Sequence, residues 1–412
     1  MTTKSVASGF VKYSSKFGSH LSEPPIAWDS KNEILIFKNF TGNKSALLWQ
    51  ISMILAIDTI GLGSSLYLAY ELYFHQRSNL NEDNLSNLLT ILIFGMAYLY
   101  GLTLHFVINV YGKDAVNGWN AMKMICQKLA AENRLVGKEP KESDIAPHSS
   151  LANTLSHLIR SYGYLPYILT LSAMIFSYDY YFYIVQRLSD TYRLNLVALS
   201  MLHCIRCLQL LISLYEISRI VCLTCLIYVD MLVMVGDIYS NLNLKIEEQM
   251  NLRDFKRLTT ICTWSYISNK NFAQFQEFGG LVSIFVGMTI CAVTNFATVK
   301  AYDVLPLPIY LVFPIMSLTN LVLVNVTLPY AHIIYERTRE FLKNCTFSAV
   351  RRGGIAGKYM RCKLRGMRPF VFYARFGSIK ILKFTKEKRM EYFESVISIT
   401  VTLLLSVPEL TR

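Results

Sequence analysis

The sequence is poor in charged side chains, which make up 17% of its 412 residues, whereas 53% are hydrophobic. A soluble domain carries about a quarter charged residues. This shortage, together with long uncharged runs, excludes an ordinary soluble fold and predicts helices that cross a bilayer, each of which needs about 20 apolar residues. The polar N-terminal stretch has no apolar core followed by a small-residue cleavage site, so we expect no signal peptide.

Motifs of enzymes are also missing. The seven histidines are scattered without a His-Glu-x-x-His pattern, and neither Gly-x-Ser-x-Gly nor a phosphate-binding loop occurs. We therefore expect no enzyme activity, no catalytic residues and no cofactor. The net charge of +13 is not gathered in a separate basic domain, which argues against nucleic acid as a partner.

The nine cysteines do not form the framework of a secreted protein, because none of them falls in a predicted external loop. Two pairs, Cys204-x-x-Cys207 and Cys222-x-x-Cys225, have the internal spacing of zinc ligands. On one continuous helix these pairs lie about 27 Å apart and cannot share an ion. We predict no metal site, although two short spans in this region would bring the pairs closer.

Seven apolar stretches predict an all-α membrane protein with seven transmembrane helices. They cover about 45–74, 88–110, 165–185, 194–239, 278–299, 307–334 and 392–407. The fourth tract has no proline and no glycine before Gly236, which predicts one long helix that continues into the cytosol. Two short spans joined near Glu216 are the alternative, and they would return the C-terminus to the cytosol.

Lysine and arginine are distributed unevenly about these spans. On the predicted boundaries, 34 of the 41 lie in the N-terminal segment and the loops on its side, and 4 lie in the opposite loops. Because cytoplasmic loops collect positive charge, we expect a cytosolic N-terminus and an extracellular C-terminus in the plasma membrane. The predicted segments are a cytosolic stretch (1–44), six helices (45–335), a basic cytosolic stretch (336–390) and a final helix with a short tail (391–412). The sequon at Asn84 falls in the first external loop and is the expected glycosylation site.

The final predicted helix carries a polar stripe. Its members lie three or four residues apart and within about 80° of one another: Glu391, Ser395, Ser398, Thr402, Ser406 and Glu409. Such a stripe either lines water or bonds to a neighbouring helix, and both interpretations stay open. The carboxylates at its ends favour a cation pore, with Leu403, Leu405 and Val407 as candidates for an apolar gate. The predicted pore-lining residues are Ser395, Ser398, Thr402, Leu403, Ser406 and Glu409.

Two features are candidates for a ligand site. Six aromatic residues lie in the eight positions from Phe176 to Tyr183, around Asp179. Aromatic residues at this depth form an interfacial belt or the wall of a pocket. Glu216 and Arg219, three residues apart in an apolar helix, are predicted to pair, either structurally or within a ligand site. The candidate ligand-binding residues are Tyr178, Tyr180, Tyr181, Tyr183, Glu216 and Arg219.

Two stretches resemble parts of insect gustatory receptors. The stretch 242–246 (Leu-Asn-Leu-Lys-Ile) is similar to the segment after their fourth span. The stretch 258–280 is similar to the Asn-x-x-Phe entry to their fifth span, and it contains Trp264, Ile267, Asn271, Phe272 and Phe278-Gly279. With its predicted topology and short last helix, the chain resembles the insect gustatory and odorant receptor superfamily. The family's C-terminal signature is Thr-Tyr, five apolar residues, then Gln-Phe. It aligns with Thr402-Leu403 and Glu409-Leu410, so only the threonine is kept.

The resemblance implies a tetrameric, ligand-gated, non-selective cation channel, formed from one or several kinds of subunit. It implies that the last helix of each subunit lines a central pore and that ligand binds among the outer halves of the earlier helices. It also implies subunit contacts through the cytosolic ends of the fourth to seventh helices. The expected partners are a small-molecule tastant or odorant and membrane lipid. A secondary transporter, or an accessory membrane protein without a pore, is the alternative.

Overall fold

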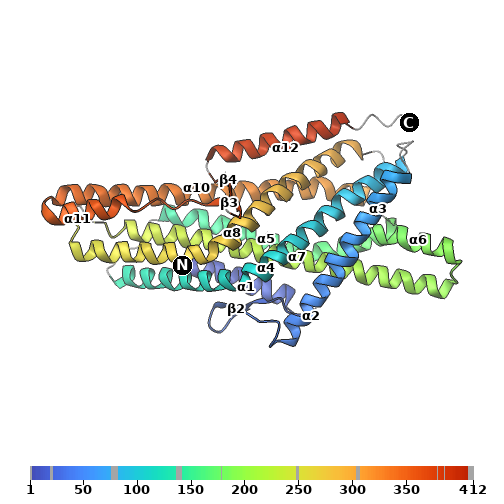
Figure 1. Ribbon diagram of the computed structural model, residues 1–412, viewed down its shortest axis with the longest axis horizontal. Helices are drawn as coiled ribbons and strands as arrows, with labels where there is room; N and C mark the ends of the chain where they lie inside the picture. The colour runs from blue at the N-terminus through green and yellow to red at the C-terminus, as the bar shows by residue number, and fades with distance from the viewer. Residues whose placement is uncertain are drawn as a thin grey trace.

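The computed structural model is an elongated bundle of helices (Figure 1). It describes residues 2–18, 22–75, 82–135, 142–177, 179–246, 250–302, 307–377, 379–384 and 386–406. The helices are α1 (Thr2–Phe17), α2 (Lys44–Met53), the π-helix η1 (Ile54–Gly61), α3 (Leu62–His75), α4 (Glu82–Leu135), α5 (Glu142–Phe176), α6 (Tyr180–Tyr192), α7 (Leu196–Asn243), α8 (Leu252–Lys300), α9 (Leu307–Tyr310), α10 (Val312–Arg352), α11 (Gly354–Arg365) and α12 (Lys386–Ser406).

Two antiparallel hairpins accompany the helices. Strand β1 (Ile26–Asp29) pairs with β2 (Ile34–Phe37), and β3 (Tyr373–Phe376) pairs with β4 (Ile379–Lys383). The bundle itself is helical, as predicted, but the hairpins correct the expectation of an all-α chain. Each has only two short strands, which are too few to form a core of their own.

Five helices of the described part are long and apolar enough to cross a membrane. They are Lys44–Tyr70, Asn153–Tyr192, Leu196–Asn243, Leu252–Lys300 and Val312–Arg352. The predicted spans at 88–110 and 392–407 fall on α4 and α12, which are not among these five. The protein therefore has the character of a multi-pass membrane protein.

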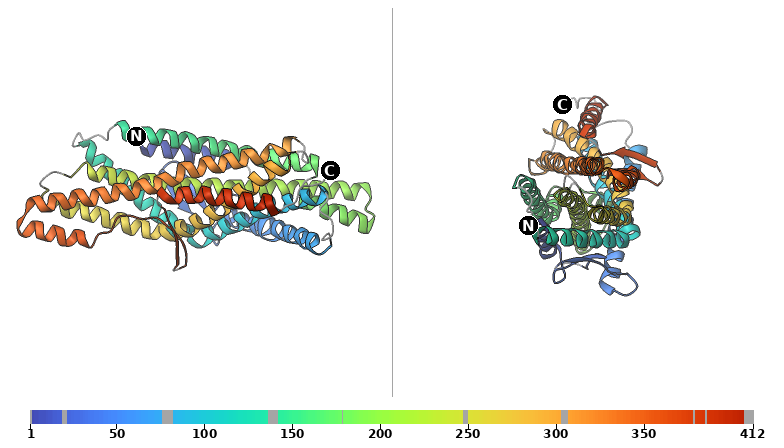
Figure 2. Two further views of the ribbon diagram at one scale, coloured as in Figure 1. Left: turned by 90° about the horizontal axis from the view of Figure 1, so that it is seen from above. Right: turned by 90° about the vertical axis from the view of Figure 1, so that its left-hand side faces the viewer.

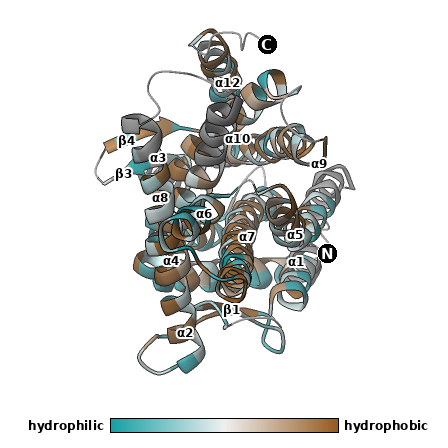
Figure 3. Cartoon of the chain, turned by 90° about the vertical axis from the view of Figure 1, so that its right-hand side faces the viewer, coloured by the Kyte–Doolittle hydropathy of each residue, from teal (hydrophilic) through white to brown (hydrophobic). Residues whose placement is uncertain are grey.

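The fourth apolar tract folds as one helix, so the long-helix prediction is confirmed and the two-span alternative is wrong. Asn195 caps its start by accepting a hydrogen bond from the Ala198 amide at 2.9 Å. Its 48 residues extend roughly 72 Å, more than twice the thickness of a bilayer core. In its most apolar stretch 89% of the residues are buried, and Figure 3 shows α7 enclosed by its neighbours. This helix is the centre of the core.

The predicted third span, 165–185, lies within the apolar stretch Asn153–Tyr192, but its helix is interrupted. Helix α5 stops at Phe176, and Ser177 adopts a left-handed conformation with φ of 58°. Asp179 then caps α6 by accepting a hydrogen bond from the Phe182 amide at 3.0 Å. Aspartate favours this position because its carboxylate accepts from an amide of the first turn, which has no partner within the helix.

The C-terminal helices extend beyond the predicted membrane segments. Helix α10 passes through position 335 and ends at Arg352, where Gly353 and Gly354 have φ of 62° and 58°. Glycine adopts this conformation without steric cost, and α11 returns along α10. The hairpin β3–β4 leads into α12, which begins at Lys386 rather than at 391 and lies on the edge of the bundle against α8 and α10 (Figure 2).

Candidate ligand-binding site

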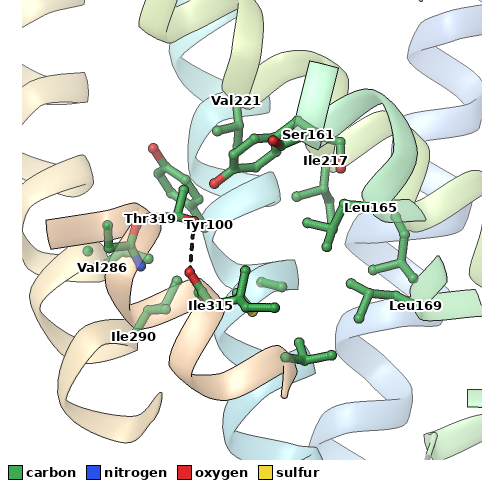
Figure 4. Close-up of a pocket in the computed structure, with 18 of the residues that line it drawn as sticks. Tyr100, Ser161, Leu165, Leu169, Ile217, Val221, Val286, Ile290, Ile315 and Thr319 are labelled. Atoms are coloured by element: carbon green, nitrogen blue, oxygen red, sulfur yellow. Dashed lines mark hydrogen bonds between the residues drawn. The ribbon is translucent and has the colours of Figure 1, made fainter. Parts of the chain in front are cut away.

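Helices α4, α5, α7, α8 and α10 line a cavity of about 300 Å³ (Figure 4). This volume lies at the lower end of the range for pockets that hold small organic ligands. The cavity was not predicted, because no single segment of the sequence forms it. Its polar lining residues are Tyr100, Ser161, Tyr162, Ser172, Ser218, Cys225, Ser283, Thr319 and Asn320.

The lining combines apolar walls with uncharged polar groups. Leu165 and Leu169 project from α5, and Ile315 and Thr319 project from α10 (Figure 4). No described lining residue is charged. A charged ligand would therefore be buried without a counter-ion, at a large cost in solvation free energy. The cavity suits a small, uncharged, mainly apolar molecule.

One hydrogen bond joins two of the helices at the cavity. Tyr100 on α4 and Ser283 on α8 place their hydroxyl oxygens 3.0 Å apart, and either hydroxyl can donate (Figure 4). Both residues line the cavity. A ligand with a hydroxyl or carbonyl group finds donors and acceptors here, because each protein hydroxyl can serve as both.

The predicted aromatic residues lie beside the cavity rather than in its described lining. Tyr180 is buried on α6 and packs edge-on against Phe94, with 5.5 Å between ring centroids. Phe94 itself lines the cavity, so the cluster supports that wall from behind. Tyr181 is buried and Tyr183 partly buried on the same helix. Tyr178 lies outside the described residues.

Asp179, the acid within the aromatic run, has a partner that sequence analysis did not identify. Arg206 on α7 donates from Nε to the two carboxylate oxygens of Asp179, at 2.9 and 3.1 Å. It also donates from Nη2 to the carbonyl of Ala173, a lining residue, at 3.0 Å. Both charged side chains are buried. The sequence carried one signal for this ion pair: Arg206 lies in an apolar tract, and a charge at such a position needs a partner.

The predicted pairing of Glu216 with Arg219 is confirmed. Arg219 Nη2 lies 2.8 and 2.7 Å from the two carboxylate oxygens, and Trp49 Nε1 donates to Glu216 Oε2 at 2.9 Å. All three side chains are buried. Ile217 and Ser218 line the cavity, but Glu216 and Arg219 are not part of its described lining. The pair holds α2 against α7, and its part in ligand binding stays a prediction.

On α12 the polar stripe and the packed face are separate. Tyr392 and Val396 are buried in an apolar cluster with residues of α8 and α10, roughly a quarter of a turn from the stripe. Thr402 donates to the Ser398 carbonyl at 2.9 Å, and Ser406 donates to the Thr402 carbonyl at 2.7 Å. These hydroxyls therefore bond within their own helix.

The remaining predicted residues differ in how fully they are described. Ser398, Thr402 and Ser406 are exposed, whereas Ser395 and Leu403 are partly buried. Glu409 lies outside the described residues, and Asn84 lies in α4 with its side chain outside the described part. Pore lining and glycosylation stay predictions for these positions.

The cysteine pairs lie on α7, so their positions follow the one-helix prediction. All nine cysteines are free. Within the described ranges, no group of three or more His, Cys, Asp or Glu side chains is arranged to hold a metal ion.

Solved structures that share this fold include two of the insect olfactory receptor OR5 from Machilis hrabei, one of them in complex with eugenol. The eugenol complex matches with a TM-score of 0.65 at 9% sequence identity, and the other structure with 0.63 at 7%. Each match covers 98% of both chains. No family model and no curated protein matches the sequence. The chain thus has the fold of this insect olfactory receptor, which agrees with the predicted resemblance at the level of the fold, and these structural neighbours are receptors rather than enzymes.

Proposed function

We propose that this chain is a subunit of a gustatory-type chemosensory receptor in the plasma membrane, and that it acts as a ligand-gated, non-selective cation channel. The observation that carries the proposal is the uncharged cavity of about 300 Å³ among five helices. Its support is the fold shared with an olfactory receptor solved in complex with eugenol. The proposed ligand is a small uncharged molecule with one or two polar atoms, because such a molecule matches the lining.

In this proposal seven helices cross the membrane, the N-terminus is cytosolic and Asn84 faces outward. The stripe on α12, from Ser395 through Ser398, Thr402 and Ser406 to Glu409, lines the conduction path. A single stripe cannot enclose a column of water, so rotational symmetry must bring several together. The family resemblance gives four. The exposure of Ser398, Thr402 and Ser406 in the single subunit supports this arrangement.

The first experiment separates a channel from a transporter. The full chain is expressed in cells, and excised patches are exposed to eugenol and to other small uncharged aromatic alcohols. A channel shows unitary cation openings whose frequency rises with ligand concentration. Substrate-coupled flux with small saturating currents and no unitary openings would instead identify a transporter and refute the proposal.

The second experiment examines the outer end of the stripe. In a symmetric assembly the Glu409 carboxylates form a ring that concentrates cations at the mouth, and salt screens this effect over a Debye length of about 8 Å. We expect Glu409→Gln to lower cation conductance, most clearly at low ionic strength, and Glu409→Lys to shift the reversal potential towards anions or abolish current. Glu394→Gln, on the same helix but off the stripe, is the control. Unchanged conductance and reversal potential in both Glu409 variants would remove α12 from the conduction path.

A further inference from the structure

Helix α12 contacts the bundle where the bundle also forms the cavity wall. Tyr392 and Val396 of α12 form an apolar cluster with Cys291 of α8, and Val324 of α10 packs against this cluster. Val324 also lines the cavity. At this residue, a single side chain therefore contacts both the cavity and the cluster that holds the final helix.

Gly287 on α8 also lies next to both the cavity and α12. It lines the cavity between Val286 and Ile290, which are labelled in Figure 4. A Cβ atom placed on Gly287 would have one neighbour within 4 Å, the hydroxyl oxygen of Tyr392 at 3.5 Å. The missing side chain therefore points towards the Tyr392 hydroxyl of α12, so Gly287 lies next to both the cavity and α12.

The hydroxyl of Tyr392 is unusual for a buried group. The residue is 6% exposed, and its oxygen has no hydrogen-bond partner in the described part of the chain. A buried hydroxyl without a partner is destabilising, because it has lost its hydrogen bonds to water and gained none in the protein. Movement of α8 or α10 at this contact therefore breaks no hydrogen bond to Tyr392, and a rearrangement that supplies a partner is favoured.

Beyond this contact α12 is loosely held. Ile397 and Leu405 are 62% and 82% exposed, whereas Tyr392 and Val396 are buried. The described helix is thus attached mainly near its N-terminal end, on the residues that share the cavity wall. A change at this attachment would be passed to the rest of α12, because a helix moves as a rigid element.

We infer that Tyr392 couples occupancy of the cavity to the position of the final helix, through Gly287 and Val324. A molecule in the cavity displaces these two residues, and their displacement changes how Tyr392 holds α12. Tyr392 is a positioning residue, since it contacts the wall and not the ligand. The inference rests on the proposed function, which takes the cavity as the ligand site and α12 as the pore helix.

The test fills the cavity without a ligand. Ala97→Phe adds a ring from α4, and Leu169→Phe does the same from α5 should the first variant fail to fold; both positions line the cavity. Amide hydrogen exchange is measured over α12 in the full chain in lipid nanodiscs, because exchange reports local opening. We expect filling to change exchange in α12 by about five-fold, equivalent to ~1 kcal/mol. With Tyr392→Phe added, the change should fall below about two-fold. Unchanged exchange in α12, with altered exchange around Thr319 in α10, would overturn the inference.

A pair of glycine variants provides the matched control. Gly287→Ala places a methyl group at van der Waals distance from the Tyr392 hydroxyl, whereas Gly280→Ala on the same helix meets only the ring of Phe384, at 4.0 Å. We expect altered exchange in α12 for Gly287→Ala and wild-type exchange for Gly280→Ala. Equal behaviour of the two variants would contradict the inference. Neither measurement needs current, so a chain that never conducts refutes the proposed function and leaves the coupling result standing.

Discussion

Helices α7 and α12 are both proline-free and were both predicted to span the membrane, but the bundle holds them in opposite ways. In α7, 89% of the residues of the most apolar stretch are buried, whereas α12 buries Tyr392 and Val396 and exposes Leu405 to 82%. Whether a predicted span belongs to the core or lies at its edge therefore depends on how many other helices surround it.

The polar groups of the two helices also differ in burial, as their apolar groups do. Arg206, Glu216 and Arg219 of α7 are buried and bonded to other protein groups. The hydroxyls of Thr402 and Ser406 on α12 are exposed and bond to their own helix. A charge enclosed by protein must be paired, whereas an exposed hydroxyl stays available to water or to another subunit. We therefore regard α7 as the scaffold and α12 as the movable element.

The strongest test of the scaffold role of α7 is to leave a charge unpaired in this helix. Arg219→Leu removes both hydrogen bonds from Nη2 to the Glu216 carboxylate, which stays buried. We expect a loss of about 3–5 kcal/mol in the free energy of unfolding, because an uncompensated charge in the core is strongly destabilising. Thermal unfolding of the purified full chain in detergent measures this loss.

The double variant Glu216→Gln with Arg219→Leu is the control. It removes both charges and keeps a group that can accept from Trp49 Nε1, the third member of the network. Most of the lost stability should return, because no charge is left without a counter-ion. A double variant as unstable as Arg219→Leu would show that Arg219 acts through packing rather than through charge.

The same substitution on both helices tests how tightly each helix is packed. Leu226 on α7 is fully buried, at 0% exposure, and Leu405 on α12 is 82% exposed. We expect Leu226→Ala to lower the free energy of unfolding by about 2–5 kcal/mol through lost burial and a new cavity. Leu405→Ala should change it by less than about 0.5 kcal/mol. Equal losses would mean that α12 is packed as tightly as α7 in the assembled protein.

A smaller effect is expected for an ion pair outside the predicted spans. Glu132, near the C-terminal end of α4, contacts Lys245 at 2.8 Å and Arg257 at 2.5 Å. Burial alone would raise the pKa of Glu132, but the hydrogen bonds and charges of Lys245 and Arg257 outweigh burial and lower this pKa below its ordinary value. The stabilisation is therefore present above the ordinary carboxyl pKa and lost as the pH falls through the lowered one.

Glu132→Gln removes this pH dependence. At pH 7 the variant should be less stable than wild type by less than about 1 kcal/mol, because partly exposed ion pairs contribute little. The difference should shrink as the pH falls through the lowered pKa of Glu132, because the wild-type carboxylate then takes up a proton and loses its charge. Thermal unfolding at pH 7, 5 and 3 measures it. A difference that stays constant across this range would show that Glu132 stabilises the fold by shape and not by charge.

Local spacing predicted several features correctly. The absence of proline and glycine before Gly236 gave the single helix α7, and the three-residue spacing of Glu216 and Arg219 gave their pairing. Both depend on the geometry of one helix, in which residues three apart share a face. Short sequence resemblances also led to the fold that the solved olfactory receptor confirms.

Long-range features were not predictable in this way. Asp179, at the start of α6, pairs with Arg206 on α7, whereas the predicted third span ran through Asp179 without the helix break that precedes it. The hairpin β3–β4 was also missed, because two short strands next to basic residues resemble an ordinary cytosolic loop. In each case the deciding contact joins segments that do not share a helix.

Hydropathy and the spacing of small and charged residues determine that this chain forms long membrane helices, since both act within one segment. Only the packing of five helices creates the uncharged cavity, and only the packing of α12 against α8 places Gly287 next to both the cavity and Tyr392. The sequence of α8 by itself does not distinguish Gly287 from Gly280, because a glycine acquires its role from the side chain that a distant segment brings against it.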